Sequence, residues 1–148
     1  MRTGLIGLVC GVISFCNCLT AYAEYNPQKE DLYVAVIVTE AAGESFQGKV
    51  AVAEVLRNRN WRTRGFVGLR RPDLRRFLAA ESVSRRHARR AIRAVRNGSQ
   101  VCRGATHYEN VQTFGWPKDW DRRRMKFLVK IGQHSFYREH PRRAYARN

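Results

Sequence analysis

The sequence predicts a mainly helical α+β domain with a small antiparallel sheet near its C-terminus. Three observations support this fold class. Apolar residues recur at helical spacing in several segments between residues 30 and 98. Short, aromatic-rich segments of alternating character follow from residue 105. No internal repeat and no linker rich in Pro, Gly or Ser divides the chain, so we expect a single domain.

The first 23 residues have the pattern of a secretory signal peptide. Arg2 precedes an apolar run from Leu5 to Leu19, and Ala-Tyr-Ala at 21–23 is a suitable cleavage site. An uncleaved membrane anchor is the alternative, but the run is about 15 residues long, against the ~20 of a spanning helix. We therefore expect a signal peptide at 1–23, a domain at 24–148, and export to the periplasm or cell envelope.

The domain expected after cleavage is strongly basic. The chain holds 28 Lys and Arg against 12 Asp and Glu, a formal net charge of +16, and loss of Arg2 with the leader would leave +15. Fourteen arginines fall between Arg57 and Arg96. Such a surface attracts polyanions by long-range forces that salt weakens. An exported chain meets anionic envelope polymers before nucleic acid, so we expect association with the former; individually, most of these arginines are simply solvated.

Four helices are expected before the sheet, in residues 30–43, 46–59, 72–80 and 82–98. The β-branched run from Val34 to Val38 is also compatible with a strand, but the length of its segment favours a helix. Ser45 is suited to cap the second helix, and Gly43 and Gly98 to end the first and the fourth.

Two short strands are expected after the helices, in residues 105–110 and 130–138. The segment between them, residues 111–127, is expected to be a loop with a helical turn. Cys102 is the only cysteine beyond the leader, so no internal disulfide is expected and packing alone must hold the domain.

Two carboxylates flank the junction of the first two helices. Glu40 follows an apolar run, and because burial disfavours the charged form of a carboxyl, it is a candidate general acid. A partly exposed glutamate at a helix end is the alternative that periodicity alone favours. Glu44 precedes the N-terminus of the next helix, whose dipole stabilises an anion, so we expect a structural or positioning role for it.

Aromatic and amide side chains are concentrated after residue 106. Sugar rings bind by stacking on aromatic faces and by hydrogen bonds to amides and carboxylates, and Tyr108, Asn110, Phe114 and Trp116 offer both. For Tyr108 and Trp116, packing in the core of a small domain is an equal alternative.

Other chemistries have weaker support. A metal site of Glu40, His107 and His134 lacks the compact ligand spacing of zinc sites. A nucleophile pair of Cys102 and His107 rests only on their proximity in sequence. No glycine-rich phosphate loop and no nucleophile elbow is present, so we expect neither a metal nor a cofactor.

Taken in order, several motifs resemble those of the SleB-like cell wall hydrolases, the spore-cortex-lytic enzyme family. VTEAAGESFQGKVAVAEVLRNR (38–59) resembles the family's opening motif, in which two acids precede Gly-Gln-Val-Ala-Val-Ala and Asn-Arg. IGQHSFYR (131–138) resembles its Ile-Gly-x-His-x-Phe-Tyr motif, and ATHYEN with the Trp-containing loop takes the place of the strand between them. The sequence departs from the pattern at Ala42, Lys49 and Glu54, where the family has Arg, Gln and an apolar residue.

The resemblance implies a lysozyme-like α+β domain that cleaves peptidoglycan glycan strands with one essential glutamate, which by position is Glu40. It favours a lytic transglycosylase, in which this carboxyl protonates the glycosidic oxygen and then takes a proton from the muramyl C6 hydroxyl. A muramidase-type hydrolase, with a second carboxylate from Glu44, Glu54 or Glu109, is the alternative.

The substrate is expected to contact a set of polar and aromatic residues besides Glu40. They are Glu44, His107, Tyr108, Asn110, Phe114, Trp116, His134 and Tyr137. We expect a monomer. The main alternative from another class is a non-catalytic exported cationic protein that binds envelope polyanions or glycan, which explains the charge but not the ordered motifs. A phage-derived lysis protein would share the enzyme chemistry.

Overall fold

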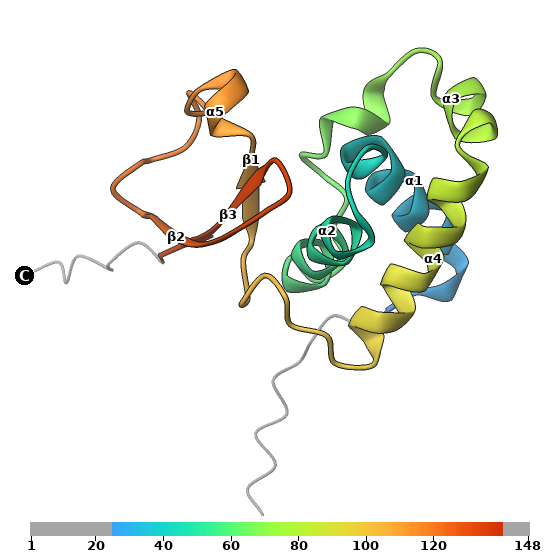
Figure 1. The fold of residues 1–148 in the computed structure, drawn as a ribbon, viewed down its shortest axis with the longest axis horizontal. Helices are drawn as coiled ribbons and strands as arrows, with labels where there is room; N and C mark the ends of the chain where they lie inside the picture. The colour runs from blue at the N-terminus through green and yellow to red at the C-terminus, as the bar shows by residue number, and fades with distance from the viewer. Residues whose placement is uncertain (1–24, 141–148) are drawn as a thin grey trace, which may run out of the picture.

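The computed structural model describes residues 25–140, so the signal peptide predicted at 1–23 lies outside the described residues. The described chain forms a helical lobe and a sheet lobe (Figure 1). The helical lobe contains the 3-10 helices η1 (Pro27–Lys29) and η2 (Val67–Arg70) and the helices α1 (Glu30–Ala41), α2 (Phe46–Asn58), α3 (Leu74–Ala80) and α4 (Ser82–Arg96). The sheet lobe contains β1 (His107–Glu109), α5 (Val111–Phe114), β2 (Met125–Ile131) and β3 (His134–Glu139).

The middle of helix α1 is buried on every side. All residues from Tyr33 to Val38 are at most 5% exposed, because α2, α4 and η2 surround the helix. A helix covered in this way carries apolar residues all round and loses its amphipathic period. This explains why the β-branched run of Val34 to Val38 was also compatible with a strand, and the predicted helix is confirmed.

Helix α2 packs on two faces. Ser45 caps it as predicted, because its Oγ accepts a hydrogen bond from the Gly48 N–H at 3.2 Å. One face enters the main hydrophobic cluster with α1 and α4, through Val50, Val52, Ala53 and Leu56. The other face enters a second cluster with the sheet, through Ala51 and Val55. The helix therefore joins the two lobes.

The sheet has three antiparallel strands in the order β1-β3-β2. The prediction of one strand at 130–138 was wrong, because that segment is a hairpin that turns at Gly132, which has φ +57°. The strand β2 begins inside the segment predicted as a loop. A register shift between Phe127 and Val129 interrupts its alternation, so the period that identifies a strand is absent from the sequence.

The remaining predicted elements are confirmed with small changes of boundary. Helix α3 begins two residues after Pro72, α4 ends before Gly98, and α5 is the helical turn expected in the loop. The predicted fold class, mainly helical α+β with a small antiparallel sheet near the C-terminus, is confirmed. Between residues 25 and 140, no helix combines the length and the apolar character needed to cross a membrane.

The segment that connects α4 to β1 is anchored on the buried carboxyl of Glu54. This carboxyl accepts hydrogen bonds from the Ser99 hydroxyl at 3.0 Å and from the backbone N–H groups of Val101 and Cys102 at 2.6 and 2.8 Å. Burial, with Glu54 as the next cause, raises the pKa of the Cys102 thiol to about 12. Glu54 is thus a structural residue, fully buried, and it lines neither of the two spaces beside Glu40.

We expect Glu54→Ala to destabilise the fold by about 3 kcal/mol or more, because three donors would lose a buried acceptor. Urea unfolding followed by circular dichroism measures this loss. Glu54→Gln, which keeps one carbonyl oxygen, should cost less. An unchanged urea midpoint for Glu54→Ala would contradict the anchoring role.

Candidate active site

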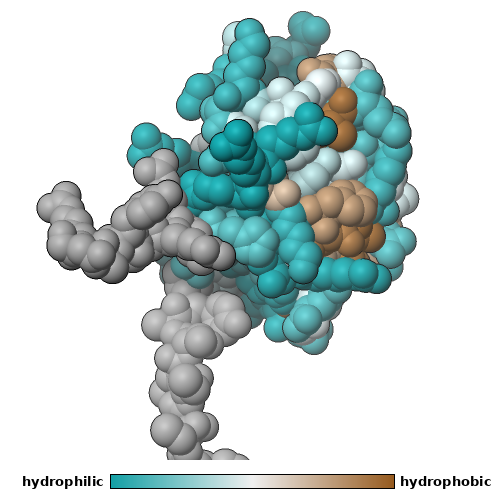
Figure 2. Space-filling view, turned by 90° about the vertical axis from the view of Figure 1, so that its left-hand side faces the viewer, coloured by the Kyte–Doolittle hydropathy of each residue, from teal (hydrophilic) through white to brown (hydrophobic). Residues whose placement is uncertain are grey.

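A cleft of about 460 Å³ lies between the two lobes. Its helical wall comes from the ends of α1 and α2 and from the chain around the start of η2, with Thr39, Glu40, Arg59, Phe66 and Val67. Its sheet wall comes from β1, α5 and the loop that follows, with His107, Tyr108, Glu109, Phe114, Asp119 and Trp120. The molecular face on the sheet side is mostly hydrophilic, and its hydrophobic areas lie in the right half of the view (Figure 2).

Glu40 stands in the last turn of α1 and directs its carboxyl into this cleft. Oε1 accepts a hydrogen bond from the Gly68 N–H at 3.0 Å, and Oε2 accepts one from the Tyr108 hydroxyl at 3.0 Å. The two donors belong to opposite walls. The side chain is half-buried, so the carboxyl is held in one orientation and still reaches the open space.

Gly68 brings the backbone of η2 close enough to donate to Glu40. A Cβ at this position would lie 2.5 Å from the Cβ of Thr39 and 3.1 Å from Oε1 of Glu40. Only glycine permits this approach without a shift of the helix end. Gly68 was missed in the sequence, because a glycine in an arginine-rich loop carries no periodic or motif signal.

Tyr108 supplies the second donor from within an aromatic packing. Its ring lies against Phe66, His134 and Phe136, with centroid distances of 6.5, 5.0 and 5.6 Å. Burial, followed by the charge of Glu40, raises the pKa of Tyr108 well above its ordinary value. The phenol therefore remains protonated near neutral pH and can keep donating to the carboxyl.

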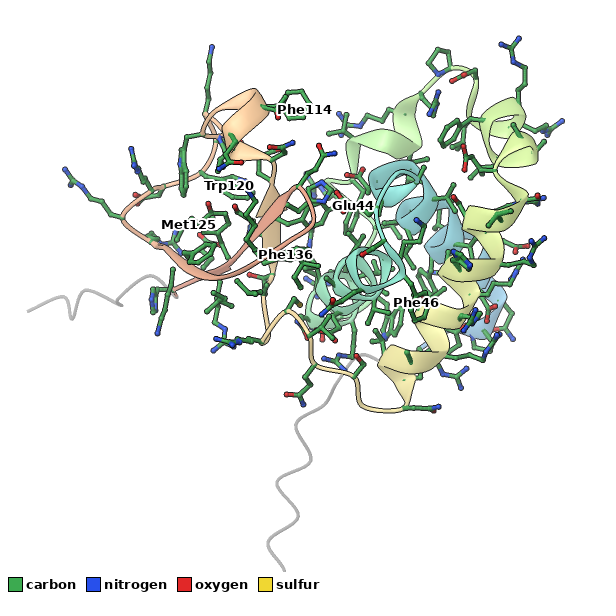
Figure 3. The ribbon with its side chains drawn as sticks, viewed as in Figure 1. Glu44, Phe46, Phe114, Trp120, Met125 and Phe136 are labelled. Carbon is green, nitrogen blue, oxygen red and sulfur yellow. The ribbon has the colours of Figure 1, made fainter. Side chains whose placement is uncertain are left out.

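A smaller hollow of about 250 Å³ adjoins the cleft on the other side of Glu40. Glu40, Phe114 and His134 line both spaces. The Phe114 ring is 77% exposed and extends from α5 toward the helical lobe (Figure 3). An extended ligand that occupied both spaces would pass the Glu40 carboxyl at their boundary.

Glu44 joins the α1–α2 junction to the β2–β3 turn, and it lines the smaller hollow (Figure 3). Its Oε1 accepts a hydrogen bond from the Gln133 N–H at 3.2 Å and lies 3.4 Å from Nδ1 of His134. Gly132 has φ +57°, a conformation that favours glycine, and a Cβ there would displace the other oxygen of Glu44. Glu44 thereby holds the two lobes together next to Glu40.

Asn110 also has a structural task beside the smaller hollow. Its side-chain oxygen accepts a hydrogen bond from the Thr113 N–H at 3.1 Å and so caps α5, while its amide nitrogen donates to Gln133 at 3.2 Å. These bonds fix the position of the short helix that carries Phe114.

Trp116 and Tyr137 line neither of these two spaces. Their rings lie 5.3 Å apart in an aromatic cluster with Trp120 and Phe127. The Trp116 indole N–H donates to the Trp120 carbonyl at 3.3 Å. The structure thus gives both residues a packing position in the sheet lobe, the alternative considered for Trp116.

His107 is in the cleft wall, with its ring edge-on to Trp120 at 5.2 Å and Nδ1 2.9 Å from the Thr106 hydroxyl. Burial lowers its pKa, so the ring is neutral at neutral pH. Within residues 25–140, no three His, Cys, Asp or Glu side chains group closely enough to hold a metal ion, and this includes Glu40, His107 and His134.

Three further cleft residues were not predicted as site residues from the sequence, namely Arg59, Asp119 and Trp120. The Arg59 guanidinium lies 4.7 Å from the Phe66 ring centroid and donates to the Arg64 carbonyl. Burial lowers its pKa, and Tyr108 and Glu40 oppose this shift. Its place in the Asn-Arg end of the opening motif was the signal that could have identified it.

The sequence matches the Cell Wall Hydrolase family over residues 43–137. The catalytic domain of the Bacillus cereus SleB protein has a similar structure, with 22% identity, a TM-score of 0.54, and coverage of 78% of this chain and 93% of that chain. The catalytic domain of the germination-specific lytic transglycosylase SleB from Bacillus anthracis is also similar, with 22% identity and a TM-score of 0.54. The match covers 77% of this chain and 97% of that chain. At this identity, the two structures establish a shared fold. No curated protein matches the chain.

Removal of the Tyr108 hydroxyl tests the orientation of Glu40. We expect Tyr108→Phe to lower turnover on the order of tenfold to a hundredfold, because the carboxyl loses one of its two fixed donors. The melting temperature should move little, since the ring packing remains. Tyr137→Phe is the matched control on the neighbouring strand and should leave turnover unchanged. Equal losses in both variants would contradict the role of the Tyr108 bond.

Proposed function

The chain belongs to the cell wall hydrolase family, and from this premise we propose that it cleaves peptidoglycan at the glycosidic bond between N-acetylmuramic acid and N-acetylglucosamine. The observation that carries the proposal is the Glu40 carboxyl at the boundary of the cleft and the smaller hollow. A glycan strand that lay along both spaces would present one linkage to this carboxyl.

Glu40 is proposed to act first as acid and then as base. The protonated carboxyl gives its proton to the glycosidic oxygen, the bond to the muramyl C1 breaks, and positive charge develops on that sugar ring. The resulting carboxylate then takes the proton from the muramyl C6 hydroxyl, whose oxygen bonds to C1 and closes a 1,6-anhydro ring. Gly68 and Tyr108 keep the carboxyl oriented through both steps.

The distribution of the other acids supports this single-carboxyl route. Glu54 is buried against the segment after α4, and Glu44 is bound to the β2–β3 turn. Glu109 and Asp119 do line the cleft, and a hydrolase would have to recruit one of them. Glu109 already accepts a hydrogen bond from the Asn110 N–H at 2.8 Å. The lytic transglycosylase named among the similar structures agrees with this choice.

Digestion of purified peptidoglycan, with products identified by mass spectrometry, tests the proposal. The wild type should release 1,6-anhydromuropeptides, and Glu40→Gln should lower the rate at least about a hundredfold by removing the acid and base. Glu109→Gln and Asp119→Asn are the controls and should stay active. If the wild type instead released reducing-end products, and if one of the two control variants no longer released them, the reaction would be hydrolysis and not transglycosylation. Undiminished release by Glu40→Gln would refute the assignment of Glu40.

We also propose that the protein is exported and that α4 holds it on anionic envelope polymers. The exposed arginines of this helix are Arg86, Arg90, Arg93 and Arg96. Helix α4 lies on the side of the helical lobe that faces away from the sheet lobe (Figure 1). Electrostatic binding there would leave the cleft open to the glycan.

The double variant Arg86→Gln, Arg93→Gln should leave the cell wall at lower salt than the wild type, because binding by counterion release depends on the number of cations in contact. Co-sedimentation over a series of NaCl concentrations measures this. Lys118→Gln with Arg123→Gln removes the same charge from the sheet lobe and should have less effect. Identical salt curves for the two double variants would show that net charge, not α4, decides retention.

A further inference from the structure

A second cavity of about 460 Å³ opens on the helical lobe, as large as the cleft that contains Glu40. It is formed by η1, the first turn of α1 and the loop that follows α2. The residues that matter for its chemistry are Lys29, Tyr33, Asn60, Trp61, Arg62 and Arg64. None of the residues assigned to the cleaving reaction lines it.

The cavity carries positive charge without acidic residues to balance it. Lys29, Arg62 and Arg64 are exposed, and no acidic residue is among the nine described lining residues. The nearest acids in sequence, Glu30 and Asp31, are paired with Arg89 of α4 at 2.9 and 2.7 Å. A negatively charged ligand would therefore meet three cations.

The aromatic residues of the cavity form its floor and do not offer a stacking face. Tyr33 is 2% exposed and Trp61 is 8% exposed, and both rings pack with Tyr25. A sugar ring needs an exposed aromatic face to stack on, whereas carboxylates and peptide groups need cations and amides. The guanidinium groups and the side-chain amide of Asn60 match the second requirement.

The loop that bears these groups is fixed in place. The Asn60 and Trp61 N–H groups donate to the carbonyls of Arg57 and Leu56, both at 2.8 Å, and so end α2. Trp61 has φ +56°, an uncommon value for a bulky residue, and its ring centroid lies 5.0 Å from those of Tyr25 and Tyr33. The cavity is thus formed before any ligand binds.

The same loop forms a wall of the Glu40 cleft. Arg59, Gly65 and Phe66 line the cleft, while residues 60–64 line the second cavity. Within the loop, the Arg59 guanidinium donates to the Arg64 carbonyl. Along α1, Tyr33 of the second cavity and Glu40 of the cleft are seven residues apart, a rise of about 10 Å. A chain attached to a sugar in the cleft would pass over the loop and cover about this distance to reach the cavity.

We infer that the second cavity binds the carboxylates of an acidic peptide, and that this peptide is the stem peptide that muramic acid carries in peptidoglycan. Stem peptides have free carboxylates and backbone amides, which the cations and Asn60 can bind while the glycan lies in the cleft. The inference deepens the proposed function and rests on it. It makes the stem peptide part of what the enzyme selects.

The test compares cleavage of intact peptidoglycan with cleavage of glycan strands from which an amidase has removed the stem peptides. Arg62→Gln with Arg64→Gln should lower kcat/KM on the peptide-bearing substrate on the order of tenfold, by loss of charge-assisted hydrogen bonds. The rate on the stripped glycan should not change. Arg75→Gln with Arg76→Gln removes the same charge from α3, outside both cavities, and should match the wild type on both substrates.

A binding assay separates this inference from the proposed function. A soluble stem tetrapeptide, titrated into the Glu40→Gln protein and followed by NMR, should shift resonances of Asn60 and Trp61. The shifts should vanish when Arg62 and Arg64 are also replaced, and persist with the α3 replacements. Absence of binding, or binding that ignores Arg62 and Arg64, overturns the inference even if peptidoglycan is cleaved. Binding that needs these arginines supports the cavity even if Glu40 proves not to be catalytic.

Discussion

Helix α2 contributes one row of side chains to each of the two hydrophobic clusters, so thirteen residues hold the helical lobe against the sheet. Val50 and Leu56 face α1 and α4, while Ala51 and Val55 face the sheet. The same helix carries Glu54, whose buried carboxyl fixes the chain between the lobes. Because the interior is close-packed, the separation of the two lobes cannot vary freely. The width of the cleft follows from this packing.

The carboxyl of Glu40 depends directly on that separation. One of its donors, Gly68, belongs to the helical lobe, and the other, Tyr108, belongs to the sheet lobe. Glu44 repeats the arrangement one turn further on, where it reaches the β2–β3 turn at Gln133. Gly68 and Gly132 allow these approaches because neither has a Cβ. The site is therefore an interface between lobes, and its geometry is only as fixed as their contact.

Two buried charged residues, Lys49 and Glu54, fix the segments that connect α2 to its neighbours. Lys49 lies at the α1–α2 junction, where its ammonium group donates to the carbonyls of Ala42 and Glu44. Burial lowers the pKa of Lys49, and the charges of Glu44 and Glu81 oppose this shift in part. Glu54 does the corresponding task at the other end of the helix. Lys49 and Glu54, two of the departures from the family pattern, thus have structural roles. The Glu40 carboxyl, in contrast, reaches the open cleft from α1.

The sequence by itself determined the helices, the Ser45 cap and the position of Glu40 at the end of α1, because periodicity and capping depend on residues within about one helical turn. Only the tertiary structure decided what Glu40 meets, since its bond to Tyr108 joins residues 68 apart in the chain and that of Glu44 to Gln133 joins residues 89 apart. It also decided that Trp116 packs in the sheet lobe, away from the cleft. Such contacts arise from the packing of α2 against both lobes, which no local pattern encodes.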